Sequence, residues 1–193
     1  MDTAPNDYPE AVETERLHLR RLQPTDLDQM AAVWADPDVW QSLRPGQSGD
    51  PTAAAAETIE RHVRHWEEHD FGLWAVIESA SGDLVGWIGA SHPTFVPELA
   101  DEIEIGWTLR RSSWGRGLAT EAARAAANAA ISHLAPERLI SLILPDNTRS
   151  IAVAERLGMH PAETAFHREA DLELRVYELR SSSGASPQSI SSR

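Results

Sequence analysis

Apolar residues recur along the chain with two different spacings, and these spacings predict its elements. Leu17 and Leu19 alternate with polar residues, as in a strand that buries one face. Ile59, Val63 and Trp66 recur every three to four residues, which is typical of a helix with one apolar stripe. Because both periods occur in one chain, we expect a domain in which helices pack on a sheet.

The same spacings, bounded by turn residues, divide the chain into expected elements. Strands are expected over 16–22, 72–78, 84–90, 102–109, 138–144, 160–167 and 172–179. Helices are expected over 25–36, 51–69 and 117–134 and from residue 147. Asp36-Pro37 is expected to end the first helix, and Asp50-Pro51 to begin the second. The polar segment 38–50 between them is expected to be a connection.

The order of these elements predicts how the sheet is built. Strand 102–109, helix 117–134 and strand 138–144 form a crossover unit, so these two strands should be parallel. The hairpins elsewhere should be antiparallel. The predicted fold class is mixed α/β (α+β), with a mostly antiparallel twisted sheet of about six to seven strands and about four helices. One domain is expected over 13–180, between a flexible leader (1–12) and a disordered serine-rich tail (181–193).

A glycine turn joins strand 102–109 to the alanine-rich helix that follows. The residues from Ser113 to Ala122 read Ser-Trp-Gly-Arg-Gly-Leu-Ala-Thr-Glu-Ala. Gly115 and Gly117 allow a sharp turn and close approach of a ligand to the backbone. Because the first N–H groups of a helix lack partners, a phosphate group fits there, although many such turns are purely structural. The chain has no lysine for a Walker loop, and Thr120 replaces the third glycine of a dinucleotide fingerprint.

This stretch resembles the acetyl-CoA loop of the GNAT N-acetyltransferases, and in particular their RimJ/RimL-like (ribosomal-protein N-terminal acetyltransferase-like) branch. The loop is usually written Gln/Arg-x-x-Gly-x-Gly/Ala, and its slots fall on Trp114, Gly117 and Ala119. Trp114 differs from the Gln/Arg of the first motif position. The sequence resembles the branch's motif, Trp-Gly-x-Gly-x-Ala-Thr-Glu-Ala, more closely. Segments 13–20, 104–107 and 147–159 resemble the family's opening strand, central strand and Asn-x-x-Ser helix.

The resemblance implies the GNAT fold, in which the two parallel strands splay apart and the cosubstrate acetyl-CoA lies between them. The free backbone edge of 107–109 would pair with pantetheine, and the glycine turn would bind the pyrophosphate. The implied cofactor-binding residues are Trp107, Thr108, Leu109, Trp114, Gly115, Arg116, Gly117, Leu118, Ala119, Thr120 and Asn147. Asn147 could instead be only the N-cap of its helix.

Acetyl transfer from a thioester to an amine needs a neutral amine and a proton for the departing thiolate. Glu102 and Glu104 share one face of their strand and could hold a water molecule or the substrate ammonium. Glu104 is the preferred base, although the pair could be a solvated strand face. The resemblance makes Ser150 the general acid, because both tyrosines, Tyr8 and Tyr177, lie outside the matching segment.

Other residues are weaker candidates. Trp40, His92 and Glu102 are proposed to bind the acceptor substrate, while most tryptophans are expected in the core. His62, His65 and His69 lie on one expected helix, where spacing of four could bind a metal. Because no third ligand is evident, we expect surface histidines and no metal.

Composition narrows the functional classes. The 193 residues include no cysteine, which excludes disulfides and a thiolate nucleophile. The net charge of −13 argues against nucleic-acid binding. It either gives solubility or favours a cationic partner. The absence of a signal-peptide pattern or a spanning apolar run predicts a cytoplasmic protein that does not bind membranes.

The leading prediction is an acetyl-CoA-dependent N-acetyltransferase that acts by direct attack within a ternary complex, as a monomer or homodimer. The acceptor would be a primary amine, either the α-amino group of a protein, which could have a basic N-terminus, or a small amine. The alternative is a GNAT-like sensor or interaction module that binds acyl-CoA and catalyses poorly. A nucleotide-binding protein without acyl chemistry is disfavoured by the missing Walker lysine.

Overall fold

The structure is a computed structural model that describes residues 7–180. The predicted tail (181–193) and the first half of the predicted leader (1–6) lie outside this range. The strands are β1 (Ala11–Glu13), β2 (Leu17–Arg21), β3 (Leu73–Glu78), β4 (Leu84–Ser91), β5 (Ile103–Leu109), β6 (Arg138–Ile143), β7 (His160–His167) and β8 (Leu172–Arg180). The α-helices are α1 (Leu27–Trp34), α2 (Pro37–Leu43), α3 (Pro51–His69), α4 (Leu118–Leu134) and α5 (Thr148–Arg156). Short 3₁₀ helices cover Pro24–Asp26, Pro97–Leu99 and Arg111–Ser113.

The strands form one sheet in the order β1-β2-β3-β4-β5-β6-β8-β7. Only β5 and β6 are parallel among the described strands, and all other neighbours are antiparallel. The predicted mixed, mostly antiparallel fold is therefore confirmed, including the parallel pair. The sheet has eight strands rather than the expected six to seven. One addition is β1, which lies partly within the stretch predicted to be a flexible leader, and Tyr8 before it stacks on the core residue Trp74.

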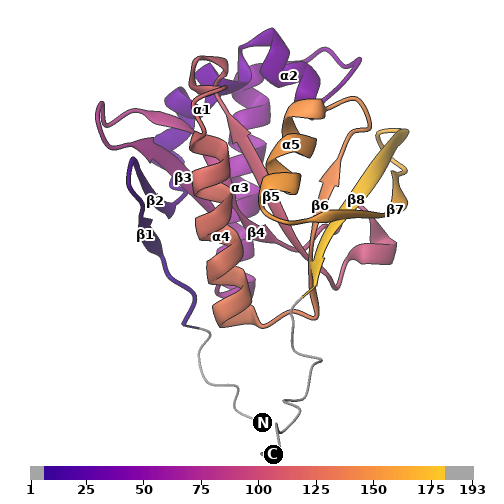
Figure 1. Ribbon diagram of the computed structural model, residues 1–193. Helices are drawn as coiled ribbons and strands as arrows, with labels where there is room; N and C mark the ends of the chain where they lie inside the picture. The colour runs from indigo at the N-terminus through magenta and orange to yellow at the C-terminus, as the bar shows by residue number, and fades with distance from the viewer. Residues whose placement is uncertain (1–6, 181–193) are drawn as a thin grey trace, which may run out of the picture.

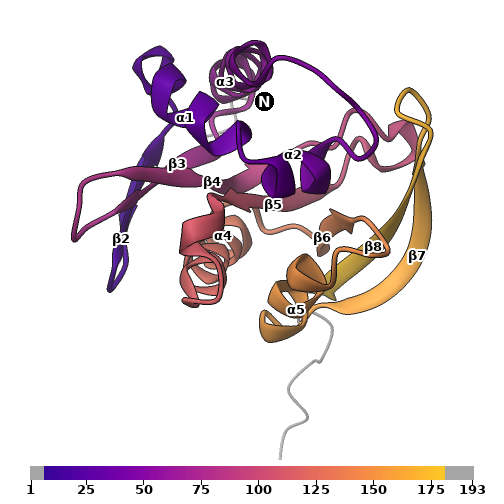
Figure 2. The same ribbon diagram turned by 90° about the horizontal axis from the view of Figure 1, so that it is seen from above.

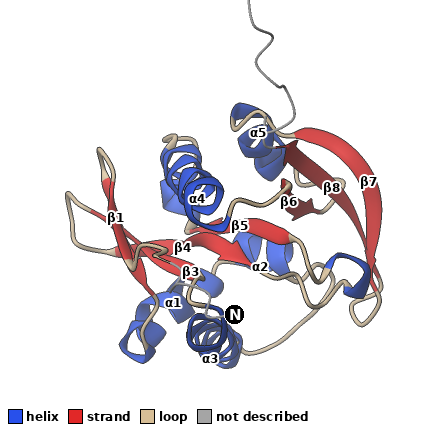
Figure 3. Ribbon diagram, turned by 90° about the horizontal axis from the view of Figure 1, so that it is seen from below, coloured by secondary structure: helices blue, strands red, loops and turns tan. Residues whose placement is uncertain are grey.

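Helices cover both faces of the sheet (Figures 1 to 3). Figure 3 shows α4 and α5 on one face and α1, α2 and α3 on the other. Helix α4 packs on the middle of the sheet through a buried row of small side chains, which lets its backbone lie close to the strands. These buried alanines are Ala122, Ala123, Ala126, Ala127, Ala129 and Ala130.

The segment 38–50 is not simply a connection, because it contains most of α2. The Asp36 side chain accepts a hydrogen bond from the backbone N–H of Asp38 at 2.9 Å, and Pro37 takes the first helical position. The predicted stop at Asp36-Pro37 is therefore the start of a new helix. Helix α3 begins in the same way, with the Asp50 side chain accepting from the Thr52 N–H at 2.9 Å.

The parallel strands β5 and β6 separate soon after they meet. Their ladder consists of two pairs, Ile103 with Leu139 and Glu104 with Ile140. On its other edge, β5 stays paired with β4 as far as Leu109. Within the described chain, the backbone of 106–109 therefore has no strand partner on the β6 side. This splayed pair leaves a wedge in the sheet between α4 and α5 (Figure 3).

Candidate active site

Two cavities meet at the wedge between β5 and β6. The first, which we call the α4 groove, has a volume of about 770 Å³ and lies among the end of β5, the glycine turn and α5. The second, which we call the α3 cavity, has a volume of about 700 Å³ and lies among α3, β4, β5 and β6. Both are lined by Ser42, Leu43, Trp107, Asn147 and Ser150. The two cavities therefore share a junction on the splayed edge of β5.

A buried side chain bridges β5 and β6 at the root of the wedge. Ser141 of β6 is 1% exposed, and its Oγ donates a hydrogen bond to the Ile105 carbonyl oxygen at 2.6 Å. Ile105 follows directly after the last ladder pair, so this bond replaces the next backbone bond of the ladder. The predicted cofactor residues Trp107, Thr108 and Leu109 lie beyond it and line the α4 groove.

The glycine turn has the geometry that its sequence predicts. Gly115 and Gly117 have φ of +72° and +79°, a region that favours glycine, and Gly117 is the N-cap of α4. A Cβ built on Gly115 would meet no atom within 4 Å, so the turn stays open to a ligand. Leu118, Ala119 and Thr120 follow in the first turn of α4 and also line the groove. Their N–H groups are the unpaired donors of a helix start.

Two predicted residues of this turn have roles that the sequence did not show. The Trp114 indole Nε1 donates to the Leu109 carbonyl at 2.7 Å, so the tryptophan bridges the end of β5 to the turn. The Arg149 guanidinium lies 4.7 Å from the Trp114 ring centroid. Arg116, in contrast, forms an ion pair with Glu78 and does not line the groove. This ion pair holds the Arg116 side chain away from the groove, so its predicted place in the cofactor-binding turn would depend on its backbone.

Helix α5 presents Asn147 and Ser150 at the junction of the cavities. The Asn147 side chain is the N-cap, because its Oδ1 accepts from the backbone N–H of Ser150 at 3.1 Å. The N-cap interpretation therefore holds, and the Asn147 amide NH₂ is not consumed by this bond. The cap uses the backbone of Ser150, so it leaves the hydroxyl at the junction without a role in the helix start.

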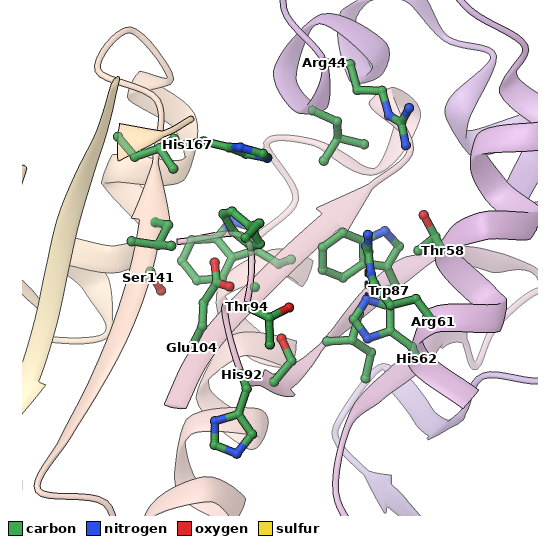
Figure 4. Close-up of a pocket in the computed structure, with 18 of the residues that line it drawn as sticks. Arg44, Thr58, Arg61, His62, Trp87, His92, Thr94, Glu104, Ser141 and His167 are labelled. Carbon is green, nitrogen blue, oxygen red and sulfur yellow. Dashed lines mark hydrogen bonds between the residues drawn. The ribbon is translucent and has the colours of Figure 1, made fainter. Parts of the chain in front are cut away.

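Glu104 lies on the wall of the α3 cavity, beside Ser141 (Figure 4). Desolvation by the surrounding protein raises the pKa of its carboxyl to about 7. A backbone hydrogen bond from Leu142 and the positive charge of Arg61 act in the opposite direction but are weaker. Near neutral pH the carboxyl is therefore poised between its two forms, which suits a group that accepts a proton during a reaction.

Glu102 does not join Glu104 in the cavity. It precedes the first residue of β5, and its carboxylate lies 2.9 Å from the Arg138 guanidinium. Arg138 also pairs with Glu163 and Glu178, so Glu102 belongs to an ion-pair cluster at the base of the sheet. Neither cavity is lined by Glu102, so this geometry gives no support to its predicted role in substrate binding.

Of the other two residues predicted to bind the acceptor substrate, one lines a cavity and the other does not. His92 lines the α3 cavity, where its ring Nδ1 lies 3.0 Å from the Glu102 carbonyl oxygen. Trp40 lines neither cavity and is a core residue, 9% exposed, with its indole donating to the Gln47 carbonyl at 2.8 Å. Trp34, which packs edge-on against Trp40, lines the α3 cavity instead. The structure therefore gives no support to the predicted contact between Trp40 and the acceptor.

The sequence missed one whole wall of the α3 cavity, which comes from α3. Thr58, His62 and His65 are buried there, although the histidines were expected on the surface. His65 accepts the backbone N–H of His92 at Nε2, so its Nδ1 carries the proton that is given to the Phe71 carbonyl at 2.8 Å. Burial lowers the pKa of His65 to about 4, which keeps the ring neutral. The available signal was spacing: 58, 62 and 65 form a helical stripe beside the apolar one.

Neither a metal site nor a membrane-spanning segment is visible in the described part of the chain. Within residues 7–180, no group of three or more His, Asp or Glu side chains is placed to hold a metal ion. In the same range, no helix combines the length and apolar character that crossing a membrane requires.

Comparisons with known proteins agree with this architecture. A family model described as "Acetyltransferase (GNAT) domain" matches residues 16–160. The chain is 29% identical over 172 residues to the Bacillus subtilis (strain 168) protein YkkB, covering 87% of this chain and 94% of that one. It is 26% identical to the N-acetyltransferase p20 of Bacillus licheniformis, covering 77% and 82% of the two chains.

Solved structures show the same likeness. The crystal structure of an acetyltransferase from Agrobacterium tumefaciens str. C58 superposes with a TM-score of 0.74 at 29% identity, covering 89% of this chain and 94% of that one. The family match spans most of the chain and includes β5, the glycine turn, α4 and all of α5. The chain therefore belongs to the GNAT acetyltransferase family and is an N-acetyltransferase.

Proposed function

We propose that the chain binds acetyl-CoA in the α4 groove and transfers its acetyl group directly to a primary amine in the α3 cavity. The observation that carries this proposal is the junction at Trp107, Asn147 and Ser150, where the two cavities meet. A donor and an acceptor that enter from opposite sides would bring their reacting ends together there. Such placement supplies much of the rate of a two-substrate reaction.

The residues around the α4 groove fit acetyl-CoA. The unpaired edge of β5 at 107–109 offers backbone groups to the amides of pantetheine, as in strand addition. The start of α4 offers N–H groups and a positive helix end to the pyrophosphate. Arg149 and Arg156 also line the groove and add positive charge to it. When bound, acetyl-CoA would supply the activated acetyl group.

Two side chains would move protons. Glu104 would accept a proton from the attacking amine, directly or through a water molecule, because its raised pKa of about 7 lies close to that of a free α-amino group. Ser150 would donate a proton to the departing thiolate, since its hydroxyl is at the junction and is not needed for the helix cap. Tyr8 and Tyr177 are both buried in the core, which leaves Ser150 as the donor.

The RimJ/RimL-like sequence motif from Trp114 to Ala122 supports placement in that branch and transfer to an α-amino group. The test is mass spectrometry of a panel of primary amines, protein N-termini included, after incubation with acetyl-CoA and the full chain. N-acetylated products that require the enzyme would support the proposal. Tight acetyl-CoA binding without any acetylated amine would overturn it and favour the acyl-CoA sensor.

A further inference from the structure

The α3 cavity contains an arginine that forms no ion pair with any described residue, although the carboxylates of Glu57 and Glu104 act on it from a greater distance. Arg61 of α3 lines the cavity, and its Nη2 lies 3.4 Å from Nε2 of the neighbouring His62 ring. Within residues 7–180 no carboxylate forms an ion pair with it. The other two arginines that line this cavity are both paired, Arg44 with Glu57 at 2.9 Å and Arg64 with Glu60 at 2.8 Å. Among the described residues, Arg61 is thus the one arginine of this cavity without an ion-pair partner.

The side chains around Arg61 add hydrogen-bond donors rather than acceptors. Because a guanidinium can only donate, His62 must accept at Nε2 and carry its proton on Nδ1. That Nδ1 is buried without a partner, and so are the indole Nε1 atoms of Trp34 and Trp87, two further residues of the cavity. Desolvation lowers the pKa of His62, so the ring stays neutral and does not repel Arg61. Buried donors are normally paired, so these three donors lack an acceptor among the described residues.

Arg61 and Glu104 lie on opposite walls of the same cavity. Figure 4 shows Arg61, His62 and Trp87 on one side and Glu104 on the other. Each wall suits one end of a molecule that carries both charges. The Glu104 wall suits the reacting amine, and the Arg61 wall suits an anionic group with several acceptor oxygens. Two oxygens of one carboxylate match the fork of a guanidinium.

We propose that the acceptor is a small primary amine that also carries a carboxylate, of the amino-acid type, and that Arg61 binds this carboxylate and sets specificity. The proposal rests on the proposed function, because it assigns the α3 cavity to the acceptor. The cavity volume of about 700 Å³ suits a small ligand. The net charge of −13 does not oppose it, because at close range a guanidinium in a partly enclosed cavity outweighs screened surface charges.

Binding measurements test the role of Arg61 without requiring catalysis. The probes are the common α-amino acids and their α-carboxamides, titrated calorimetrically into the full chain with CoA present and absent. We expect at least one acid to bind about 100-fold more tightly than its amide, as for a charge-assisted hydrogen-bonded pair. Arg61→Gln should remove this preference. Arg64→Gln is the matched control, because Arg64 lines the same cavity but is already paired, and it should keep the preference.

The results separate this inference from the proposed function. Equal binding of acids and amides, no binding of any acid, or a preference that survives in Arg61→Gln would each overturn the role of Arg61. Arg61-dependent binding of an acid without thiol release from acetyl-CoA would support the anion site while contradicting the proposed function. Acetyl transfer to acids and amides with equal efficiency would support the proposed function while contradicting the anion site at Arg61. Arg61→Glu adds a positive readout, because it should favour diamines over amino acids.

Discussion

The Ser141 hydroxyl donates a 2.6 Å hydrogen bond to the carbonyl of Ile105, directly after the last backbone pair between β5 and β6. Both partners are buried, at 1% exposure each. The side chain ends the ladder with its polar atoms paired, while the backbones move apart beyond it. The wedge is therefore built into β6 by one small polar residue, and the cavities that meet there depend on it.

Ser141→Ala should weaken both the fold and the groove. The Ile105 carbonyl would be left without this partner in a buried position, so we expect a loss of about 1–2 kcal/mol in the free energy of unfolding. We also expect weaker acetyl-CoA binding, because the edge of β5 would be less well fixed. Thr58→Val is the control, since its buried hydroxyl donates to a carbonyl within α3. Denaturant melts that show equal losses for both variants would contradict the account.

Ala119→Asp separates stability from cofactor binding at the start of α4. A carboxylate in the first turn of a helix interacts favourably with the helix dipole, so the melting temperature should stay the same or rise. The same charge lines the groove and should repel the pyrophosphate, so acetyl-CoA affinity should fall about tenfold or more. Calorimetric titration would measure the acetyl-CoA affinity of both the variant and the wild type. Unchanged affinity in a folded variant would show that the pyrophosphate lies elsewhere.

Ser150→Ala should slow turnover without unfolding α5. The Asn147 cap uses the backbone N–H of Ser150, which alanine keeps, so stability should change little. Loss of a general acid typically costs a factor of about 100 or more in kcat. Acetyl-CoA affinity should stay close to that of the wild type. Asn147→Ala is the contrasting variant, because it removes the cap and should cost about 1 kcal/mol of stability. A kcat that does not change in Ser150→Ala would exclude the hydroxyl as the proton donor.

Glu104→Gln should change the pH dependence of both rate and stability. The raised pKa predicts that wild-type kcat falls as pH drops below about 7, and that this inflection disappears in the variant. Any inflection that remains belongs to the acceptor amine. Stopped assays across pH 5 to 9 at saturating substrates would measure this. Identical profiles for the two proteins would exclude Glu104 as the base.

Glu104→Gln should lose activity but gain stability at neutral and higher pH. Because the folded-state pKa lies above the ordinary value of 4.5, folding favours the protonated carboxyl, and its ionisation costs stability as pH rises from about 4.5 to about 7. Glutamine cannot ionise. Relative to wild type, the variant should therefore gain of the order of 2 kcal/mol between pH 5 and pH 8, after allowance for partial exposure. A difference in melting that does not depend on pH would contradict the raised pKa.

The elements of the cofactor side were predictable because local rules determine them. The glycines at 115 and 117 permit a turn with positive φ, and a crossover helix requires the flanking strands to be parallel. The N-terminal half of the chain was harder, because the same dipeptide has two meanings. Asp-Pro at position 36 reads as a stop after α1, yet it caps α2 as Asp-Pro at position 50 caps α3.

The acceptor side could not be predicted from local pattern. Its wall is the polar stripe of α3, which includes His62 and His65, and polar helical positions normally face solvent. Glu102 pairs with Arg138 because β6 lies beside β5. The strand pattern grouped Glu102 with Glu104 and could not show this pairing between strands. Arg61 and Arg64 are both polar positions of α3, three residues apart, and nothing in the sequence pattern separates them. Only the packing of α3 against the sheet distinguishes the unpaired cation from the paired one.

The most direct measurement is a single-turnover experiment with the full chain, in which acetyl-CoA is bound first and a primary amine is added second. Free thiol and N-acetylated amine are then followed together. We expect both products to form in equal amounts and only when the amine is present, and we expect the step to be slower in Ser150→Ala and Glu104→Gln. Acetyl-CoA that stays bound and intact with every amine tested would contradict acetyl transfer by this chain and favour an acyl-CoA sensor.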